Sequence, residues 1–285
     1  MKAVVDQAAA LWRLDPARIT LAAQRENAVW KAATDHGDFA LRLHRIGYRS
    51  QDELVSELDW MAMLARGGMA VPRPVASVNA RLVEKVDGVA VDLLTWLPGR
   101  MVGSHGALNG IADRPGHMRR LGALLAQLHT LSDAWAPPAG FTRPRWDRAG
   151  LVGAAPLWGP FWNNPQLTPD QAALLLRVRD KANARLAAIE QQLDFGLIHA
   201  DAITENVMID GADLSLIDFD DGGWGFRDFD LATVLMRQLT SPDYAKLRAA
   251  LLAGYAAPQG GCPGAGSVRA AARADLSGLD HPASA

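Results

Sequence analysis

The feature that most constrains the fold is a change of hydrophobic pattern near residue 97. Before it, five short runs have the length and composition of β-strands, at residues 19–23, 28–33, 39–44, 81–86 and 89–96. One helix interrupts them, because Ser50 and Glu53 form a capping box ahead of an apolar stripe with helical spacing. Beyond residue 97 the helical period dominates, at residues 118–131 and 168–192 and again from about residue 230. The pattern predicts an α+β fold in which a small antiparallel β lobe precedes a larger, mainly helical lobe.

The same change of pattern divides the chain into three expected segments. The β-rich lobe covers residues 1–97, the helical lobe covers residues 98–254, and a low-complexity tail covers residues 255–285. From Ala256 onward the tail contains nine Ala, five Gly and three Pro, with only three large aliphatic residues. Such a segment buries too little apolar surface to offset its ordering entropy, so we expect disorder. Its abrupt onset after Tyr255 also raises the possibility of a frameshifted or otherwise altered C-terminus.

Composition excludes several classes of protein. Lys and Arg number 29 against 31 Asp and Glu, so there is no broad basic face for nucleic acid or for an acidic membrane. The single cysteine, Cys262, excludes an internal disulfide framework and a cysteine-based zinc cluster. The first residues lack the unbroken apolar run of a signal peptide, and no run approaches the ~18 residues of a membrane span. We therefore expect a cytoplasmic protein without nucleic-acid or membrane partners; its oligomeric state cannot be read.

The stretch from Leu197 to Asp218 is the most informative part of the chain. Two apolar runs around a Gly-containing turn predict an antiparallel hairpin. Counted outward from Ala212, Asn206 and Asp218 are equidistant, which places an amide oxygen and a carboxylate at the open end of the hairpin. Hard oxygen ligands of this kind suit Mg²⁺. Asp201 would lie on the loop that leads to the same end, where it could deprotonate an attacking hydroxyl.

The alternative is that His199, Asp201 and Asn206 are loop residues that make only local turn hydrogen bonds. One match to His-x-Asp-x₄-Asn arises by chance in roughly 1% of chains of this length. The match here also comes with a flanking apolar strand, a hairpin and a mirrored Asp218. This combination favours a functional interpretation.

The motifs resemble those of the aminoglycoside phosphotransferase/choline kinase-like family, close to its homoserine kinase and bacterial stress-kinase-like branch. The resemblance rests on His199-x-Asp201-x₄-Asn206, on Ile217-Asp218-Phe219-Asp220 and on Asp230-Leu231-Ala232. It implies a protein-kinase-like fold, with the residues from about 19 to 255 covered. It also implies that Asp201 is the catalytic base and that Asn206 and Asp218 bind Mg²⁺. His199 supports the loop, and Asp230 braces it from a helix start. Asp220 either assists at the metal, is solvated, or supports the metal ligands from behind.

The β-rich lobe contains matching candidates for nucleotide binding. Strand alternation places Ala40 and Arg42 on one face, similar to the Ala-x-Lys arrangement of the third kinase strand with Arg in place of Lys. Glu57 lies at the edge of the apolar helix stripe and would pair with Arg42 to position phosphates; the alternative is an unpaired, exposed Glu57. Residues 95–99 resemble the kinase hinge, where backbone groups of Thr95 and Leu97 would meet adenine. A glycine-rich phosphate loop is absent, which argues against an ordinary protein kinase.

The function that this resemblance implies is ATP- and Mg²⁺-dependent transfer of a phosphoryl group to a hydroxyl of a small molecule. One alternative is a Ser/Thr protein kinase of the bacterial stress-kinase type. Another is a catalytically impaired, nucleotide-binding relative with an altered C-terminus. The sequence does not identify the acceptor.

Overall fold

The structure is a computed structural model of the 285-residue chain that describes residues 2–24, 27–104 and 107–258. The chain forms two compact units. Unit 1 consists of Met1–Gly110, Ala134–Arg143 and Ala202–Asp220. Unit 2 consists of Ile111–Asp133, Pro144–Asp201 and Asp221–Ala285. The first segment of unit 1 thus extends beyond the expected boundary at residue 97, and the expected tail lies outside the described residues from residue 259 on.

Unit 1 contains the N-terminal antiparallel sheet that the sequence predicts. Its strands are β1 (Ile19–Gln24), β2 (Ala28–Thr34), β3 (Gly37–Leu43), β4 (Pro74–Val75), β5 (Val83–Val86) and β6 (Val89–Thr95). The order is β1-β2-β3-β6-β4, and β5 pairs with β6. The five expected strands all form, and the short β4 is added to them. The pairing of β3 with β6 sets Arg42 opposite Asp92, a register that shapes the site described below.

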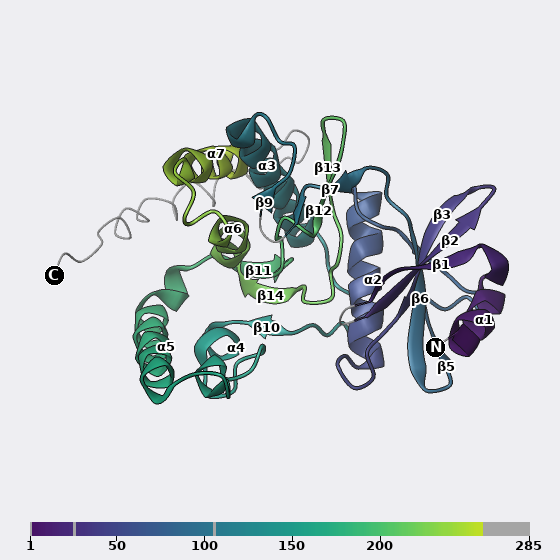
Figure 1. Cartoon of the computed structure of the whole chain (residues 1–285), viewed down its shortest axis with the longest axis horizontal. Helices are drawn as coiled ribbons and strands as arrows, with labels where there is room; N and C mark the ends of the chain where they lie inside the picture. The colour runs from purple at the N-terminus through teal and green to yellow at the C-terminus, as the bar shows by residue number, and fades with distance from the viewer. Residues whose placement is uncertain (1, 25–26, 105–106, 259–285) are drawn as a thin grey trace. The chain divides into compact units, whose positions relative to one another are not determined.

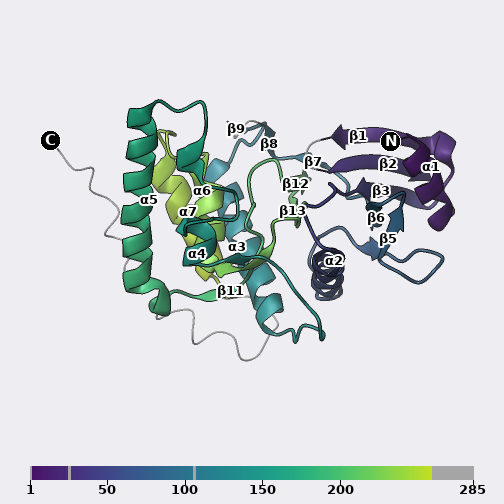
Figure 2. The ribbon, with the colours of Figure 1, turned by 90° about the horizontal axis from the view of Figure 1, so that it is seen from below.

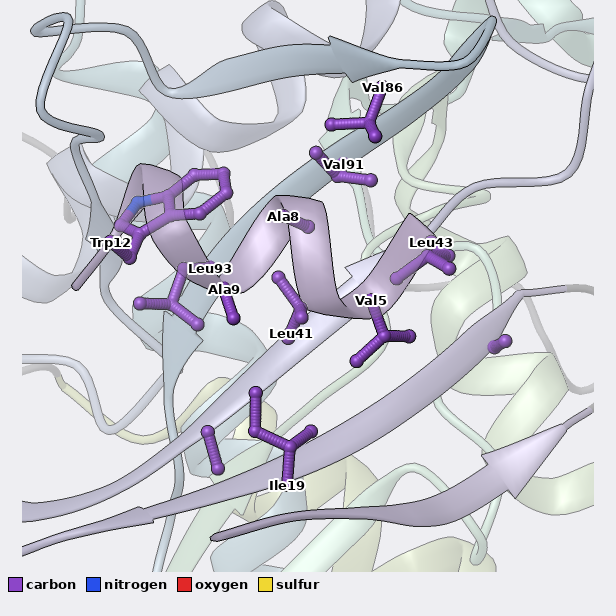
Figure 3. Packing of buried hydrophobic residues seen from close by; sticks show 12 residues of the cluster. Val5, Ala8, Ala9, Trp12, Ile19, Leu41, Leu43, Val86, Val91 and Leu93 are labelled. Atoms are coloured by element: carbon purple, nitrogen blue, oxygen red, sulfur yellow. The ribbon is translucent and has the colours of Figure 1, made fainter. Parts of the chain in front are cut away.

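Helix α1 (Lys2–Leu11) packs on one face of this sheet and was not expected from the sequence. Its residues Val5, Ala8 and Ala9 are fully buried, and they contact apolar side chains of the sheet such as Leu41 (Figure 3). Trp12, just after the helix, donates from its indole Nε1 to the Val75 carbonyl at 2.8 Å. The small side chains at helical spacing let the helix lie close to the strands.

Helix α2 (Gln51–Arg66) also belongs to unit 1 and begins where the sequence predicts (Figure 1). The Glu53 N–H donates to the Ser50 hydroxyl at 3.2 Å, and the Ser50 N–H donates to the Glu53 carboxylate at 2.9 Å. This capping box satisfies donors that the first turn otherwise leaves unpaired. The buried face of the helix carries mainly apolar side chains, but it also includes Glu57.

Three small elements complete unit 1. Strand β12 (Val207–Asp210) pairs with β13 (Asp213–Leu216) on one side and with β7 (Arg100–Met101) on the other. A second small sheet joins β8 (Gly103–Ser104) to β9 (Ala107–Leu108), and a 3₁₀ turn, Pro16–Arg18, precedes β1. The hairpin of β12 and β13 is the one that the sequence predicts.

Unit 2 is mainly helical. Its core pair is α3 (Arg114–Asp133) and α7 (Tyr244–Ala256). The two helices can approach closely because Gly122 and Gly254 have no side chain; a Cβ at either position would overlap the backbone of the other helix. Helix α6 (Arg227–Met236) follows a three-stranded sheet of β10 (Arg145–Trp146), β14 (Gly223–Phe226) and β11 (Phe195–Ile198). Helices α4 (Arg148–Val152) and α5 (Pro169–Ile189) lie next to each other (Figure 2), with short 3₁₀ turns at Phe161–Asn163 and Glu190–Gln192. Among the described residues, no helix is long and apolar enough to span a membrane.

One polar side chain in the core of unit 2 makes its stability depend on pH. His117 on α3 is fully buried, and neither ring nitrogen has a hydrogen-bond partner within the described part of the chain. Burial, and then the nearby Arg120, lowers the pKa of His117 to about 4. The imidazole binds a proton near pH 6.5 in the unfolded chain, but only near pH 4 in the folded chain. Its contribution to the stability of the folded state is therefore fully present above pH 6.5 and is lost as pH falls toward 4.

We therefore predict that His117→Leu weakens the acid sensitivity of the protein. Between pH 7 and pH 4.5, the free energy of unfolding should fall by about 2–3 kcal/mol less in the variant than in the wild type. Urea denaturation at a series of pH values measures this difference. His36→Leu, in the exposed turn between β2 and β3, is the matched control and should leave the pH dependence unchanged. Equal slopes for wild type and His117→Leu would contradict the prediction.

Candidate functional site

The first cluster of candidate residues surrounds Arg42 on β3. Its Nε and Nη2 donate to the two carboxylate oxygens of Asp92 on β6, both at 2.8 Å. Its Nη1 donates to Glu57 Oε1 on α2, also at 2.8 Å. Arg42 is 6% exposed and both carboxylates are fully buried. The structure thus brings Arg42 and Glu57 together, and the alternative of an exposed, unpaired Glu57 is wrong.

Two partners in this cluster were missed by sequence reasoning. Asp92 lies directly opposite Arg42 in the β3–β6 register, and it also accepts from His44 Nε2 at 2.6 Å. A carboxylate within the apolar run of residues 89–96 was the signal available in the sequence. Burial alone would raise the pKa of Asp92, but Arg42 and then His44 outweigh it and hold that pKa well below its ordinary value. Arg42 therefore stands between two ionised carboxylates.

Arg143 is the second missed partner, and it links Glu57 to the segment after the hairpin. Its Nη1 lies 3.5 Å from Glu57 Oε2 and 2.9 Å from the Glu53 carbonyl. Its Nη2 donates to the Phe219 and Asp220 carbonyls at 2.8 and 2.6 Å. Burial opposes the charge of Glu57, yet Arg42 and Arg143 together lower its pKa below the ordinary value. The sequence carried no local sign of Arg143, because its partners lie 76 to 90 residues away.

The hairpin differs from the sequence prediction in its register. Asp210 pairs with Asp213, so the turn is centred between Gly211 and Ala212 and not on Ala212. The Ile217 N–H donates to the Asn206 carbonyl at 3.0 Å. Asn206 is therefore opposite Ile217, and Asp218 lies one residue beyond it. Both candidate ligands remain at the open end of the hairpin, but they are not equidistant from the turn.

The backbone at Asp218 is held in an uncommon conformation. Its φ of 64° lies in the left-handed region, which costs a non-glycine residue about 1–3 kcal/mol. The next residue, Phe219, is fully buried and packs edge-on against Trp60 of α2 at 5.3 Å between ring centroids. Asp218 itself is exposed and Asn206 is 6% exposed. The anchored Phe219 thus directs the chain so that the Asp218 carboxylate faces solvent.

Asp220 has a different environment from Asp218. It is 8% exposed, and its Oδ1 has no hydrogen-bond partner within the described residues, although Arg49 Nε lies 3.9 Å away. Burial, followed by the nearby Glu57, raises the pKa of Asp220 to about 6. Asp220 is therefore not the solvated carboxylate that the sequence left open.

The donor set at the end of the hairpin suits a hard divalent cation. Asn206 offers an amide oxygen, and Asp218 offers a carboxylate. Among the described residues, no group of three or more His, Cys, Asp or Glu could hold a metal by itself. A cation of the Mg²⁺ type takes one or two protein groups and completes its shell with phosphate oxygens and water, so the amide and carboxylate oxygens named above are of the right kind for it.

Unit 2 carries the loop with His199 and Asp201. Asp230, on the first turn of α6, accepts the backbone N–H of His199 at 2.9 Å and of Ala200 at 2.7 Å. The φ of Ala200 is 66°, so Ala200 is a second non-glycine residue in the left-handed region beside a candidate site residue. The Asp201 N–H donates to His199 Nδ1 at 3.3 Å, and Asp201 is partly exposed. The structure thus brings Asp230 to the loop that carries Asp201.

Asp230 is itself held by residues that sequence reasoning did not assign to the site. His129 Nε2 on α3 lies 3.0 Å from Asp230 Oδ2, and His129 Nδ1 lies 2.9 Å from the Tyr255 hydroxyl on α7. Asp230 and His129 are fully buried. Burial would raise the pKa of Asp230, but the hydrogen bonds from His129 and His199 lower it. An ionised Asp230 therefore accepts from three donors in the interior of unit 2.

The expected hinge lies at the end of β6. The Thr95 N–H donates to the Arg73 carbonyl at 2.9 Å, and the Arg73 N–H donates to the Thr95 hydroxyl at 2.9 Å. The Trp96 N–H donates to the Asp38 carbonyl. The Thr95 N–H and hydroxyl are therefore both engaged by Arg73. Leu97 follows directly after this held segment and is partly exposed.

We predict that Asp230→Asn destabilises the protein strongly. The amide keeps one acceptor oxygen but turns an NH₂ group toward backbone N–H donors, so a buried donor loses its partner. The free energy of unfolding should fall by about 2–4 kcal/mol in urea denaturation. Asp228→Asn makes the same change at an exposed position of the same helix turn and should stay within about 0.5 kcal/mol of wild type. Equal effects of the two substitutions would show that Asp230 does not brace the loop.

Known proteins resemble this chain over most of its length. A family model described as "Phosphotransferase enzyme family" matches residues 18–270. Amicoumacin kinase of Bacillus subtilis (strain 168) is 25% identical over 84% of this chain and 68% of its own length. Homoserine kinase of Methylobacterium radiotolerans is 30% identical over 81% of this chain and 68% of its own.

The fold is also found among solved structures. The microcompartment-associated aminopropanol kinase superposes with a TM-score of 0.73 at 26% identity, covering 93% of this chain and 82% of that one. An amicoumacin kinase, hAmiN, superposes with a TM-score of 0.72 at 22% identity, covering 89% of this chain and 76% of that one. The chain has the kinase-like α+β fold and belongs to the phosphotransferase enzyme family, whose kinases use ATP to phosphorylate hydroxyl groups of small molecules.

Proposed function

We propose that this chain transfers the γ-phosphoryl group of ATP, with Mg²⁺, to the hydroxyl of a small amino alcohol. The observation that carries the proposal is the placement of Asn206 and Asp218 at one end of the β12–β13 hairpin, with Asp201 five residues before Asn206. A base, an amide ligand and a carboxylate ligand are the parts that phosphoryl transfer to a hydroxyl needs.

Each residue then has a defined role. Asp201 accepts the proton of the acceptor hydroxyl, and its loop is kept in place because Asp230 binds the His199 and Ala200 N–H groups. Asn206 and Asp218 hold the cation, with Asp220 beside them. Bound Mg²⁺ supplies charge neutralisation at the phosphates.

The residues of the N-terminal sheet would bind the nucleotide. Glu57 and Asp92 fix the Arg42 guanidinium, leaving the remaining N–H groups of Nη1 and Nη2 as the donors that could reach a phosphate. The Thr95 carbonyl and the Leu97 backbone would contact adenine. Because two carboxylates counter its charge, Arg42 positions phosphate by hydrogen bonds more than by net charge.

The acceptor class is suggested by the relatives. Homoserine and aminopropanol, named in two of them, are both small molecules with one amine and one hydroxyl group. Amicoumacin, named in another, is the larger alternative. The chain spans 68% of the length of the homoserine and amicoumacin kinases that it matches.

We predict that Asp201→Asn and Asp218→Asn fail in different ways. With Mg²⁺ and millimolar ATP, wild type and Asp201→Asn should both melt several degrees higher than without nucleotide, since the base does not hold the nucleotide. Asp218→Asn should lose most of that shift. Release of ADP with homoserine or aminopropanol should fall by a factor of about 10²–10⁴ in Asp201→Asn, which lacks the base.

Asp210→Asn is the control, because Asp210 is exposed at the turn end of the same hairpin. It should match the wild type in both measurements. Full turnover in Asp201→Asn would refute its role as the base. Transfer of label from ATP to proteins of a cell extract, with no transfer to small hydroxyl compounds, would instead favour a protein kinase. No thermal shift in the wild type would indicate an impaired relative.

A further inference from the structure

A cavity in unit 1 is lined by none of the residues assigned above to catalysis or nucleotide binding. Its volume is ≈ 170 Å³, well above the ~10–15 Å³ that a single water requires. The walls are the loop between β3 and α2 with the first turn of α2, together with the strand and turn residues 83–90 of the β5–β6 hairpin. The cavity is therefore a feature of the N-terminal sheet and its helix.

The charges that line this cavity are predominantly positive. Arg45, Arg49 and Lys85 line it, and Glu84 is the one carboxylate among its lining residues. Glu84 is engaged elsewhere, since it accepts from the Ser77 hydroxyl at 2.6 Å and from Asn79 Nδ2 at 2.8 Å. Three cations against one carboxylate favour an anionic occupant.

Two of these cations have no carboxylate partner. Within the described residues, Arg45 and Lys85 form no ion pair, and both are exposed. Arg49 is more constrained, because its Nε donates to the Asp220 carbonyl at 3.1 Å and its guanidinium lies 4.5 Å from the Tyr48 ring centroid, against 5.8 Å for Arg45. Arg45 and Lys85 are thus the side chains able to turn toward an anion without breaking an ion pair of the fold.

A buried histidine also lines the cavity. His44 is 6% exposed, and its Nε2 is bound to Asp92 at 2.6 Å. Its backbone N–H is bound to the Ala90 carbonyl. Nδ1 is therefore the ring nitrogen left to meet an occupant. Asp92, which binds His44, also accepts two hydrogen bonds from Arg42. His44 therefore connects the cavity directly to the cluster of Arg42, Asp92 and Glu57.

We propose that this cavity binds a small oxyanion, a phosphate or carboxylate group of a metabolite, between Arg45, Lys85 and His44. An arginine fork and a lysine ammonium are suited to such groups, and the imidazole adds a directional contact. An occupant fixes His44 and, through Asp92, the guanidinium of Arg42. Since Arg42 is assigned above to ATP phosphates, this second effect rests on the proposed function, whereas anion binding does not.

The test is calorimetric titration of the full chain with inorganic phosphate, and separately with succinate as the carboxylate probe, at constant ionic strength. Arg45→Gln/Lys85→Gln should weaken binding of the better probe at least about 10-fold, because two charge-assisted hydrogen bonds are lost. Arg18→Gln/Lys246→Gln removes the same charge at exposed positions outside the cavity and should bind as the wild type does. The melting temperatures of both double variants establish that they are folded.

Binding of neither probe to the wild type, or equal weakening by both double variants, would overturn the site. The link to Arg42 is tested by the dissociation constant of ATP with and without saturating probe. If the probe also competes with ATP at the nucleotide site, it does so equally in all variants. The factor by which the probe changes the dissociation constant of ATP should therefore differ by at least about 3-fold between the cavity variant and the control variant. No difference overturns the link alone. If ATP does not bind at all, that result counts against the proposed function, and the anion titration is still decided by its own measurements.

Discussion

The buried cluster of Arg42, Asp92, Glu57 and Arg143 is the interaction on which the rest of unit 1 depends. Two carboxylates that are fully buried would be very costly if they were unpaired, because burial disfavours the charged form. Each is matched by a guanidinium within 3.5 Å. Removing one member leaves an uncompensated buried charge, which typically costs about 3–5 kcal/mol. The cluster therefore fixes strand β3, strand β6 and helix α2 relative to one another.

The same cluster reaches the candidate metal ligand through Arg143. One guanidinium contacts Glu57 on α2 and the carbonyls of Phe219 and Asp220. Phe219 packs on Trp60 of the same helix. A shift of α2 would disturb Glu57 and the chain immediately after Asp218 together. In unit 1, one helix therefore sets the position of Arg42 and that of the chain beside Asp218.

The elements that could be predicted from the sequence are those with local signals. The strands follow from short apolar runs between turn residues, and α2 follows from its capping box and stripe. The pair of Arg42 and Glu57 was predicted from the resemblance to the third kinase strand, after strand and helix periodicity had placed the two side chains. Helix α1 was missed because six of its ten residues are Ala, Lys or Asp, and its apolar face becomes evident only against the sheet.

The misses in the site have a different origin. Arg143 and His129 contact partners 76 to 126 residues away, and no periodicity within a segment encodes such contacts. The hairpin register was wrong by one residue on one strand because Gly211 and Ala212 form a two-residue turn, whereas the count from Ala212 assumed three. Local patterns identify which residues bear the chemistry, but long-range contacts determine how they are held.

Backbone strain gives an independent indication of where these long-range contacts matter. Ala200 and Asp218 are two of the five non-glycine residues with positive φ in the described part of the chain. Neither lies in a simple surface turn: Ala200 is held by Asp230 through its N–H, and Asp218 precedes the anchored Phe219. A conformation that costs about 1–3 kcal/mol persists only where the surroundings fix it, and such positions cluster at functional sites. In unit 2 a buried acceptor thus holds strained Ala200 next to Asp201, and in unit 1 a buried ring anchors the residue after Asp218, which is itself both strained and the proposed ligand.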